Sequence, residues 1–312
     1  GWVDMEEVDT QYLNWLKTNK SFELNMKTQT LKLKRDAKHY IFFSDIHGNR
    51  KTINLIDKAQ FDFNDARLVG GGDYIDGRKY SKWVTDCMEE FVKMSGAIIL
   101  KGNHEQMMLN FAEGTEHQDG IWFYNGGGKT LTNIFGRTLL PDEVRESKYY
   151  RFLKSCPTMY DTPQIIFVHA GVRPDEKYND PTTYNKVVYG LKFDYDFYRI
   201  WAREEYWYSD QAEKMIFHNR TGKTIVTGHT PTAVLEGKYD DGRKMKQLQK
   251  DDCIVRKMQY PGEPARIFTD GGSHSDPLIY PHNDGNVVVL DGNGEIVRVY
   301  NWKNPQGTKF DE

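Results

Sequence analysis

The sequence of 312 residues lacks any run of the roughly 20 apolar residues that a membrane-spanning helix needs, so no membrane partner is expected. Cysteine is scarce: Cys87, Cys156 and Cys253 lie far apart and cannot form a disulfide framework, which favours a reducing, cytoplasmic location. The sequence also has no large excess of positive or negative charge, because the formal net charge is only −3. Duplex nucleic acid is therefore not an expected partner.

The composition that is present is typical of a globular protein, with 38% hydrophobic and 28% charged residues. Short apolar runs alternate with segments of helical spacing. The expected strands are 39–43, 66–69, 97–100, 164–168, 224–227, 286–290 and 296–300, and the expected helices are 50–59, 81–95 and 106–112. This alternation predicts an α/β fold.

The alternation of strands and helices is interrupted at both ends of the chain and once inside it. Residues 1–36 are expected to form an N-terminal extension, with a short helix within 5–18 followed by a strand or linker. Residues 37–303 are predicted to form one domain and 304–312 a tail. Within the domain, the charged and proline-containing segment 232–266 is expected to be an insertion between two core strands, exposed as a hairpin or flap.

Polar residues follow the predicted strands directly, at the end where open α/β sheets build their binding sites. They occur in order as Asp45-x-His47, Asp73-x-x-Asp76, Asn103-His104-Glu105, His169 and His229. An isolated Asp-x-His pair is consistent with a solvated turn, and a lone histidine is more often structural than a ligand. The occurrence of every cluster at a strand end beside glycine indicates one shared site.

Carboxylate, imidazole and amide groups are the ligands that Mn, Fe and Zn ions accept. One aspartate can offer an oxygen to each of two ions. Two ions about 4 Å apart would hold the attacking and leaving oxygens of an in-line displacement and would lower the pKa of a shared water. The residue types therefore favour hydrolysis of a phosphate ester.

The motifs resemble the calcineurin-like metallophosphoesterase superfamily, in particular the bacterial and phage form of its phosphoprotein phosphatase branch. The family pattern Gly-Asp-x-His-Gly, Gly-Asp-x-x-Asp-Arg-Gly, Gly-Asn-His-Glu, His-Ala-Gly and Gly-His-Thr is matched between Ser44 and Thr230. Weaker similarities are Asn125-Gly-Gly-Gly-Lys-Thr-Leu131, Trp201-Ala-Arg-Glu204 and Thr269-Asp-Gly-Gly272. The resemblance covers about residues 40–300 and implies two mixed β-sheets packed as a sandwich flanked by helices.

The resemblance also implies a role for each matched position. One ion would be held by Asp45, His47 and Asp73, and the second by Asp73, Asn103, His169 and His229. His104 would protonate the leaving oxygen, and Asp76 would bond the other ring nitrogen of His104 and keep it protonated and aimed. Arg203 would hold the phosphoryl oxygens through its planar guanidinium.

The sequence departs from the family pattern at a few positions. Ser44 replaces the first glycine, where a small residue still fits. Arg78 stands one position later than the arginine of the family, because Asp76-Gly77-Arg78 replaces Asp-Arg-Gly, so its phosphate-binding role is open. His274 has no counterpart in the pattern and is expected to be an ordinary loop histidine.

The expected function is metal-dependent hydrolysis of phosphate monoesters on phosphoserine or phosphothreonine proteins or on small phosphoesters. The attacking group would be a water shared by the ions, with Mn the expected metal in vitro and Fe or Zn as alternatives. A second hypothesis is a symmetrical dinucleoside tetraphosphate hydrolase or a phosphatase of nucleotide or RNA ends. A third is a catalytically silent binding module, which the complete ligand set and His104 argue against.

Overall fold

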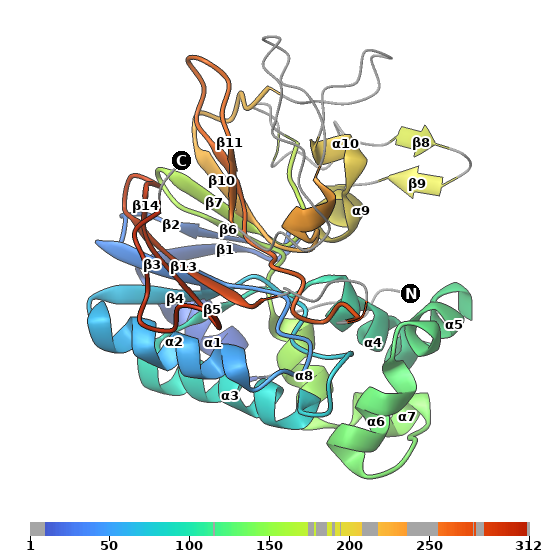
Figure 1. The fold of residues 1–312 in the computed structure, drawn as a ribbon. Helices are drawn as coiled ribbons and strands as arrows, with labels where there is room; N and C mark the ends of the chain where they lie inside the picture. Colours follow the sequence, from blue (N-terminus) through green and yellow to red (C-terminus); the bar gives the residue numbers. More distant parts are fainter. Residues whose placement is uncertain are drawn as a thin grey trace.

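In a computed structural model of the chain, most strands belong to two large sheets (Figure 1). The structure describes residues 10–114, 116–173, 178, 186–188, 191–193, 195–207, 218–235, 255–276, 278 and 284–310. The seven-stranded sheet has the order β1 (Phe22–Asn25), β2 (Thr30–Leu33), β6 (Met159–Asp161), β7 (Ile165–Val168), β10 (Thr224–Thr227), β12 (Arg266–Phe268) and β11 (Arg256–Met258). Here β2 and β6, β7 and β10, and β10 and β12 pair in parallel.

The second sheet has five strands, in the order β14 (Ile296–Asn301), β13 (Asn286–Asp291), β3 (His39–Phe43), β4 (Ala66–Gly70) and β5 (Ile98–Ile99). The neighbours β3, β4 and β5 run parallel, whereas β13 pairs antiparallel with both β3 and β14. A separate hairpin consists of β8 (Lys186–Val188) and β9 (Leu191–Phe193). The parallel strands of each sheet place their carboxyl ends together, which is where a shared site can form.

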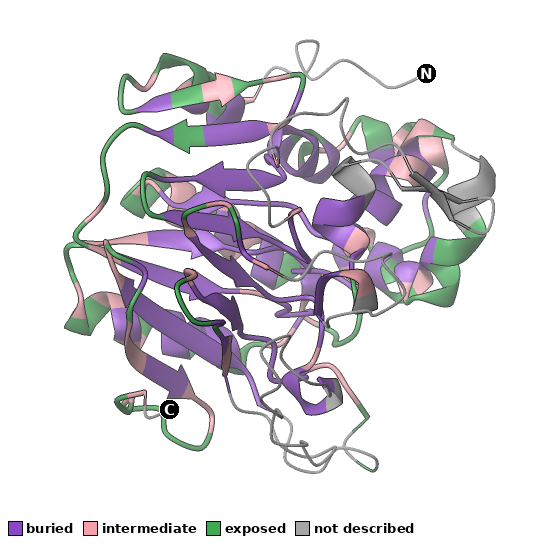
Figure 2. Ribbon diagram, turned by 90° about the horizontal axis from the view of Figure 1, so that it is seen from above, coloured by how far each residue is buried: buried purple, intermediate pink, exposed green. Residues whose placement is uncertain are grey.

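The two large sheets face each other across an aromatic core. Alternate residues of β3 point to opposite faces. The rings of Tyr40 and Phe42 lie 5.2 and 5.6 Å from the ring of Phe167 in β7, whereas Phe43 lies 6.3 Å from Phe91 in the helix α3. Strand residues are buried throughout the centre of the molecule (Figure 2). The predicted fold of two mixed sheets flanked by helices is thus confirmed.

Helices cover the outer face of the five-stranded sheet and one end of the sandwich (Figure 1). α2 and α3 pack on the five-stranded sheet, and α4 to α8 cluster beside its end. The helices are α1 (Gln11–Thr18), α2 (Lys51–Asp62), α3 (Ser81–Ser95), α4 (Asn103–Glu113), α5 (Glu116–Tyr124), α6 (Gly127–Phe135), α7 (Pro141–Arg145), α8 (Lys148–Ser155), α9 (Tyr195–Trp201) and α10 (Glu204–Trp207). Within the described residues, none of them is long and apolar enough to cross a membrane.

Two segments that the sequence sets apart from the domain are joined to the seven-stranded sheet. β2, from the expected N-terminal extension, pairs with β6, and β1 pairs with β2. β11, from the expected insertion at 232–266, pairs antiparallel with β12. Most of the expected flap, residues 236–254, lies outside the described residues. The division of the chain at residues 37, 303 and 304 stays a prediction.

Candidate metal centre

The predicted site residues meet because each follows the carboxyl end of a parallel strand. Asp45 and His47 follow β3, Asp73 and Asp76 follow β4, and Asn103 opens α4 shortly after β5. From the other sheet, the turns after β7 and β10 supply His169 and His229. The carboxyl ends of these strands converge at this point, so residues from both sheets meet at one centre.

The backbone at these turns has an uncommon conformation. The φ angle is positive at Asp45, His47, Asp73, Asp76 and His229, with values of 54°, 47°, 59°, 64° and 66°. Only one further non-glycine residue in the described part of the chain has a positive φ. Non-glycine residues in this left-handed region cost free energy and gather where function fixes the backbone. This observation is independent of the sequence motifs and falls on the same residues.

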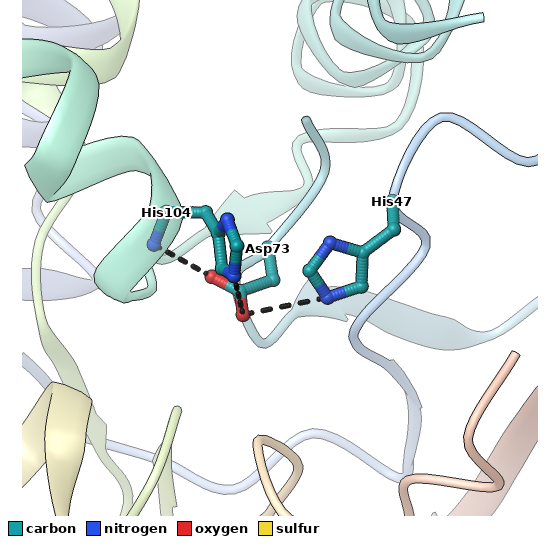
Figure 3. A group of neighbouring side chains, drawn as sticks. All are labelled: His47, Asp73 and His104. Atoms are coloured by element: carbon teal, nitrogen blue, oxygen red, sulfur yellow. Dashed lines mark hydrogen bonds and ion pairs between the residues drawn. The ribbon is translucent and has the colours of Figure 1, made fainter. Parts of the chain in front are cut away.

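The first group of candidate ligands is gathered around His47. Its Nδ1 atom lies 3.0 and 2.9 Å from the carbonyl oxygens of Ile75 and Asp76, so Nδ1 carries the proton and Nε2 presents a lone pair. Nε2 lies 3.6 Å from Asp45 Oδ1 and 3.5 Å from Asp73 Oδ2. Asp45 Oδ1 has no hydrogen-bond partner among the described residues. Figure 3 shows the Asp73 carboxylate between the rings of His47 and His104.

The second group shares Asp73 with the first. His169 Nε2 lies 3.2 Å from Asp73 Oδ2, 3.0 Å from Asn103 Oδ1 and 3.1 Å from His229 Nδ1. His169 Nδ1 donates to the carbonyl oxygen of Gly71 at 2.7 Å, so its Nε2 also presents a lone pair. Ligand atoms of Asp73, His169 and His229 all lie within 4.8 Å of one another. Asp73 therefore occupies the position of a bridge between two groups.

The donor set fits divalent metal ions. With its oxygen inward, Asn103 adds one more acceptor to a cluster of carboxylate oxygens and imidazole lone pairs, and a cation is what satisfies such a cluster. The opposite orientation of the amide would let its NH₂ group donate to Asp73 and to both histidines. A bound cation would favour the orientation in which the amide oxygen of Asn103 points towards it. These residues are candidate metal ligands, and their individual roles stay predictions.

The electrostatics of the centre also favour positive charge. Burial alone would lower the pKa of His47, yet hydrogen bonding to Asp45 and the charges of Asp73 and Asp45 raise it to about 10. The pKa of His169 likewise rises to about 9, because the charges of Asp73 and Asp45 outweigh burial. The carboxylates that favour an added proton on these imidazoles would equally stabilise a metal cation, which would replace that proton on Nε2.

His104 lies at the start of α4 with its side chain 16% exposed. Its Nδ1 atom lies 2.7 Å from Asp76 Oδ2, and its Nε2 atom lies 4.0 Å from Asp73 Oδ2. The Asp76 carboxylate also accepts from Trp122 Nε1 at 2.9 Å and from Thr130 Oγ1 at 2.5 Å. Asp76 is thereby fixed, and it fixes the His104 ring with Nε2 facing the candidate metal centre. This is the arrangement that a proton donor requires.

Trp122 and Thr130 are contacts of the site that sequence reasoning did not identify. Thr130 belongs to the Asn125–Leu131 segment, whose resemblance to the family was the available signal, whereas nothing in the sequence pointed to Trp122. Glu105 also has a larger part than its motif suggested. Its carboxylate accepts from the backbone N–H groups of Asp73, Tyr74 and Gly102 at 2.6, 3.0 and 2.9 Å. Glu105 thus ties the Asp73 turn to the start of α4.

The two arginines predicted to contact phosphate lie on different sides of the centre. Arg203, exposed between α9 and α10, has Nη1 3.4 Å from the carbonyl oxygen of His229 and 3.3 Å from Thr230 Oγ1. Arg78 has Nη2 3.5 Å from the carbonyl oxygen of Ser275, and its backbone N–H donates to the carbonyl of His47 at 2.8 Å. Arg203 therefore borders the second ligand group and Arg78 the first.

His274 lies in a turn, as expected of a loop histidine, and it packs against a residue of the candidate site. Its ring centroid lies 4.1 Å from that of His47, at an angle of 39°. Burial and the neighbouring His47 lower the pKa of His274 to about 3. It does not join either ligand group in the described residues, so it acts as packing against the ring of His47.

Comparison with known proteins points to one family. The family model described as calcineurin-like phosphoesterase matches residues 38–256. A solved cold-active protein tyrosine phosphatase has a TM-score of 0.51 and 16% identity, covering 93% of this chain and 84% of that one. A diadenosine tetraphosphatase described as putative has a TM-score of 0.47 and 16% identity, covering 87% and 97%. A serine/threonine phosphatase from Saccharomyces cerevisiae has a TM-score of 0.49 and 11% identity, covering 86% and 80%.

At these identities the likeness to solved structures concerns the fold alone. The sequence has no match among curated proteins.

Proposed function

The chain belongs to the calcineurin-like phosphoesterase family, and on this premise we propose that it is a metal-dependent phosphatase of the phosphoprotein phosphatase branch. Its substrates are phosphate monoesters, with phosphoserine and phosphothreonine in proteins as the physiological class. In the reaction, a water oxygen bonds to phosphorus while the bond from phosphorus to the serine or threonine oxygen breaks. The leaving oxygen then needs a proton.

The proposed ligands divide between two ions that share Asp73. Asp45, His47 and Asp73 would hold the first ion, and Asp73, Asn103, His169 and His229 would hold the second. Bound divalent ions would neutralise the phosphoryl oxygens and make a water nucleophilic at neutral pH. Mn, Fe and Zn all suit this set of nitrogen and oxygen donors. Gly102 leaves room for the set, because a Cβ atom there would come 2.3 Å from Asp73 Oδ1.

The His104–Asp76 pair is the observation that carries the proposal. His104 Nδ1 is bonded to Asp76, so Nε2 is the atom that can give a proton to the leaving oxygen. A serine or threonine alkoxide is a poor leaving group and depends on that proton. A nucleotide phosphate leaves readily without one. The two further hydrogen bonds that fix Asp76 support the proposal that the substrate has the poorer leaving group.

Arg203 is proposed to hold the transferred phosphoryl group. Its guanidinium lies beside His229, close to the second ligand group, and is exposed enough to meet an incoming substrate. A planar guanidinium can donate two parallel hydrogen bonds to phosphoryl oxygens and so orient them for in-line attack.

A panel of substrates tests the proposal. The purified protein with Mn is assayed against an aryl phosphate, phosphoserine and phosphothreonine peptides, a bis-aryl phosphate and a dinucleoside tetraphosphate. The phosphopeptides should give the highest kcat/KM among the biological substrates. A kcat/KM for the dinucleoside tetraphosphate well above that for every phosphopeptide would refute the proposed substrate class. Binding of phosphopeptides without turnover of any substrate would instead identify a binding module.

A further inference from the structure

A basic cavity of about 540 Å³ lies beside the loop that follows Asp76. Its wall comes from the loop after Asp76 and from α6, and it contains Arg78, Lys79 and Lys129. The remaining lining residues are glycine, threonine and asparagine, with no carboxylate among them. The cavity thus presents three cations and only neutral partners.

The charges of this cavity are not neutralised within the protein. In the described part of the chain, neither Lys79 nor Lys129 forms an ion pair, and Arg78 donates only to a backbone carbonyl. Lys79 Nζ lies over the Tyr80 ring at 5.4 Å from its centroid, which leaves its charge available. Nearby Lys82 differs, because it pairs with Asp86 at 3.1 Å. Clustered like charges without counter-charges attract an anion.

Both walls of the cavity are next in sequence to residues of the candidate site. Gly77, which lines it, directly follows Asp76, and a Cβ atom at Gly77 would lie 3.0 Å from His47 Cβ. On the α6 wall, Lys129 directly precedes Thr130, whose hydroxyl donates to Asp76. The cavity is therefore bounded by the same loop and the same helix that carry Asp76 and Thr130.

We propose that this cavity is a subsite for a second phosphate on the substrate, so that the enzyme prefers peptides with two neighbouring phosphorylated residues. The inference rests on the proposed phosphoprotein function. Adjacent residues have Cα atoms about 3.8 Å apart, so two phosphorylated side chains can reach neighbouring sites. A phosphate carries a charge of about −1.5 to −2 and three acceptor oxygens, which lysine and arginine side chains match well.

The arrangement also accounts for the displaced arginine. Arg78 stands one residue later than the phosphate-holding arginine of the family pattern. It lines the basic cavity with the two lysines. Its proposed partner is accordingly the second phosphate and not the one that is transferred.

The test uses matched peptides and the metal-loaded full chain. Each peptide has one hydrolysable phosphothreonine, followed by serine, by glutamate or by a non-hydrolysable phosphonate analogue of phosphoserine. The enzymes are the wild type, the double variant Lys79→Gln/Lys129→Gln and the control Lys82→Gln. An aryl phosphate, which has no second anion, reports on the metal centre alone.

The wild type should prefer the phosphonate peptide over the serine peptide by roughly three- to tenfold in kcat/KM, as expected for two exposed charge contacts. The double variant should lose this preference while its aryl phosphate turnover stays within about twofold, because it lacks only the exposed contacts. Lys82→Gln should behave as the wild type. Added salt should reduce the preference, since exposed contacts are screened.

Equal rates on the three peptides in the wild type, or a preference that survives in the double variant, would overturn the subsite. A preference for the glutamate peptide alone would overturn its assignment to phosphate. If the enzyme cleaves the aryl phosphate but no phosphopeptide, the proposed phosphoprotein function is refuted. The proposed subsite, which depends on a phosphopeptide substrate, is then refuted as well. The two failures are therefore distinguishable.

Discussion

Replacement of His104 by alanine separates proton transfer from metal binding. The substitution removes the imidazole that faces Asp73 and leaves Asp76 buried. Asp76 keeps its hydrogen bonds from Trp122 and Thr130, so its carboxylate is not left without partners. The fold and the proposed ligands should therefore survive, and the loss can be assigned to chemistry.

The expected loss depends on the leaving group. For a phosphoserine or phosphothreonine peptide, His104→Ala should lower kcat by about 10²- to 10⁴-fold, the usual contribution of a general acid. That corresponds to roughly 2.7–5.4 kcal/mol in activation free energy. The phenoxide that leaves from an activated aryl phosphate needs little protonation. The substitution should therefore lower kcat much less for these substrates. A plot of log kcat against the pKa of the leaving group should become steeper in the variant.

The assay combines this plot with metal analysis of the same samples. His47, Asp73 and His104 offer ligand atoms within 4.8 Å of one another, so His104 must be tested as a ligand too. The proposed role requires that the metal content stays unchanged. Loss of metal from His104→Ala, or an equal loss of activity for all leaving groups, would refute it. His39→Ala, a histidine that bonds Asp65 away from the centre, is the control and should retain full activity.

Three further substitutions probe the neighbours of the centre. Asp76→Asn should give a smaller loss of the same leaving-group-dependent kind as His104→Ala, measured by the same plot. Arg203→Ala should raise KM and lower kcat/KM by about tenfold or more with the metal content unchanged, because a charge-assisted contact to phosphate is lost. Glu105→Ala should lower the free energy of unfolding by about 2–4 kcal/mol in urea titrations, because three buried N–H groups lose their acceptor; a change below about 0.5 kcal/mol would contradict this reading.

The sequence predicts best the elements that have a continuous apolar run or a clear helical spacing of apolar residues. The apolar runs 39–43 and 224–227 match β3 and β10 residue for residue, and the expected helix 81–95 matches α3. Parallel strands that are covered on both faces have continuous hydrophobic sequences, so they can be predicted from a single sequence. The polar clusters after them could be located for the same reason, since a strand end fixes where the turn begins.

Elements that depend on tertiary contacts are not visible in this way. β1 and β2 have only four residues each and β6 three, so their periodicity is too short to predict sheet membership. Trp122 reaches Asp76 from a helix 46 positions away along the chain, and this contact has no local signal. The contact between the His274 and His47 rings likewise joins distant segments. Such contacts depend on how the layers pack, which local pattern does not encode.

The central claim is that two metal sites share Asp73, and metal analysis of Asp73→Asn beside the wild type tests it most directly. The wild type should bind about two transition-metal ions per chain, lose activity to a chelator and regain it with Mn. Asp73→Asn should bind far less metal at both sites and lose most activity, because one bridging carboxylate serves both. Full activity of the metal-free wild type, or an Asp73→Asn variant that keeps both ions, would contradict the account.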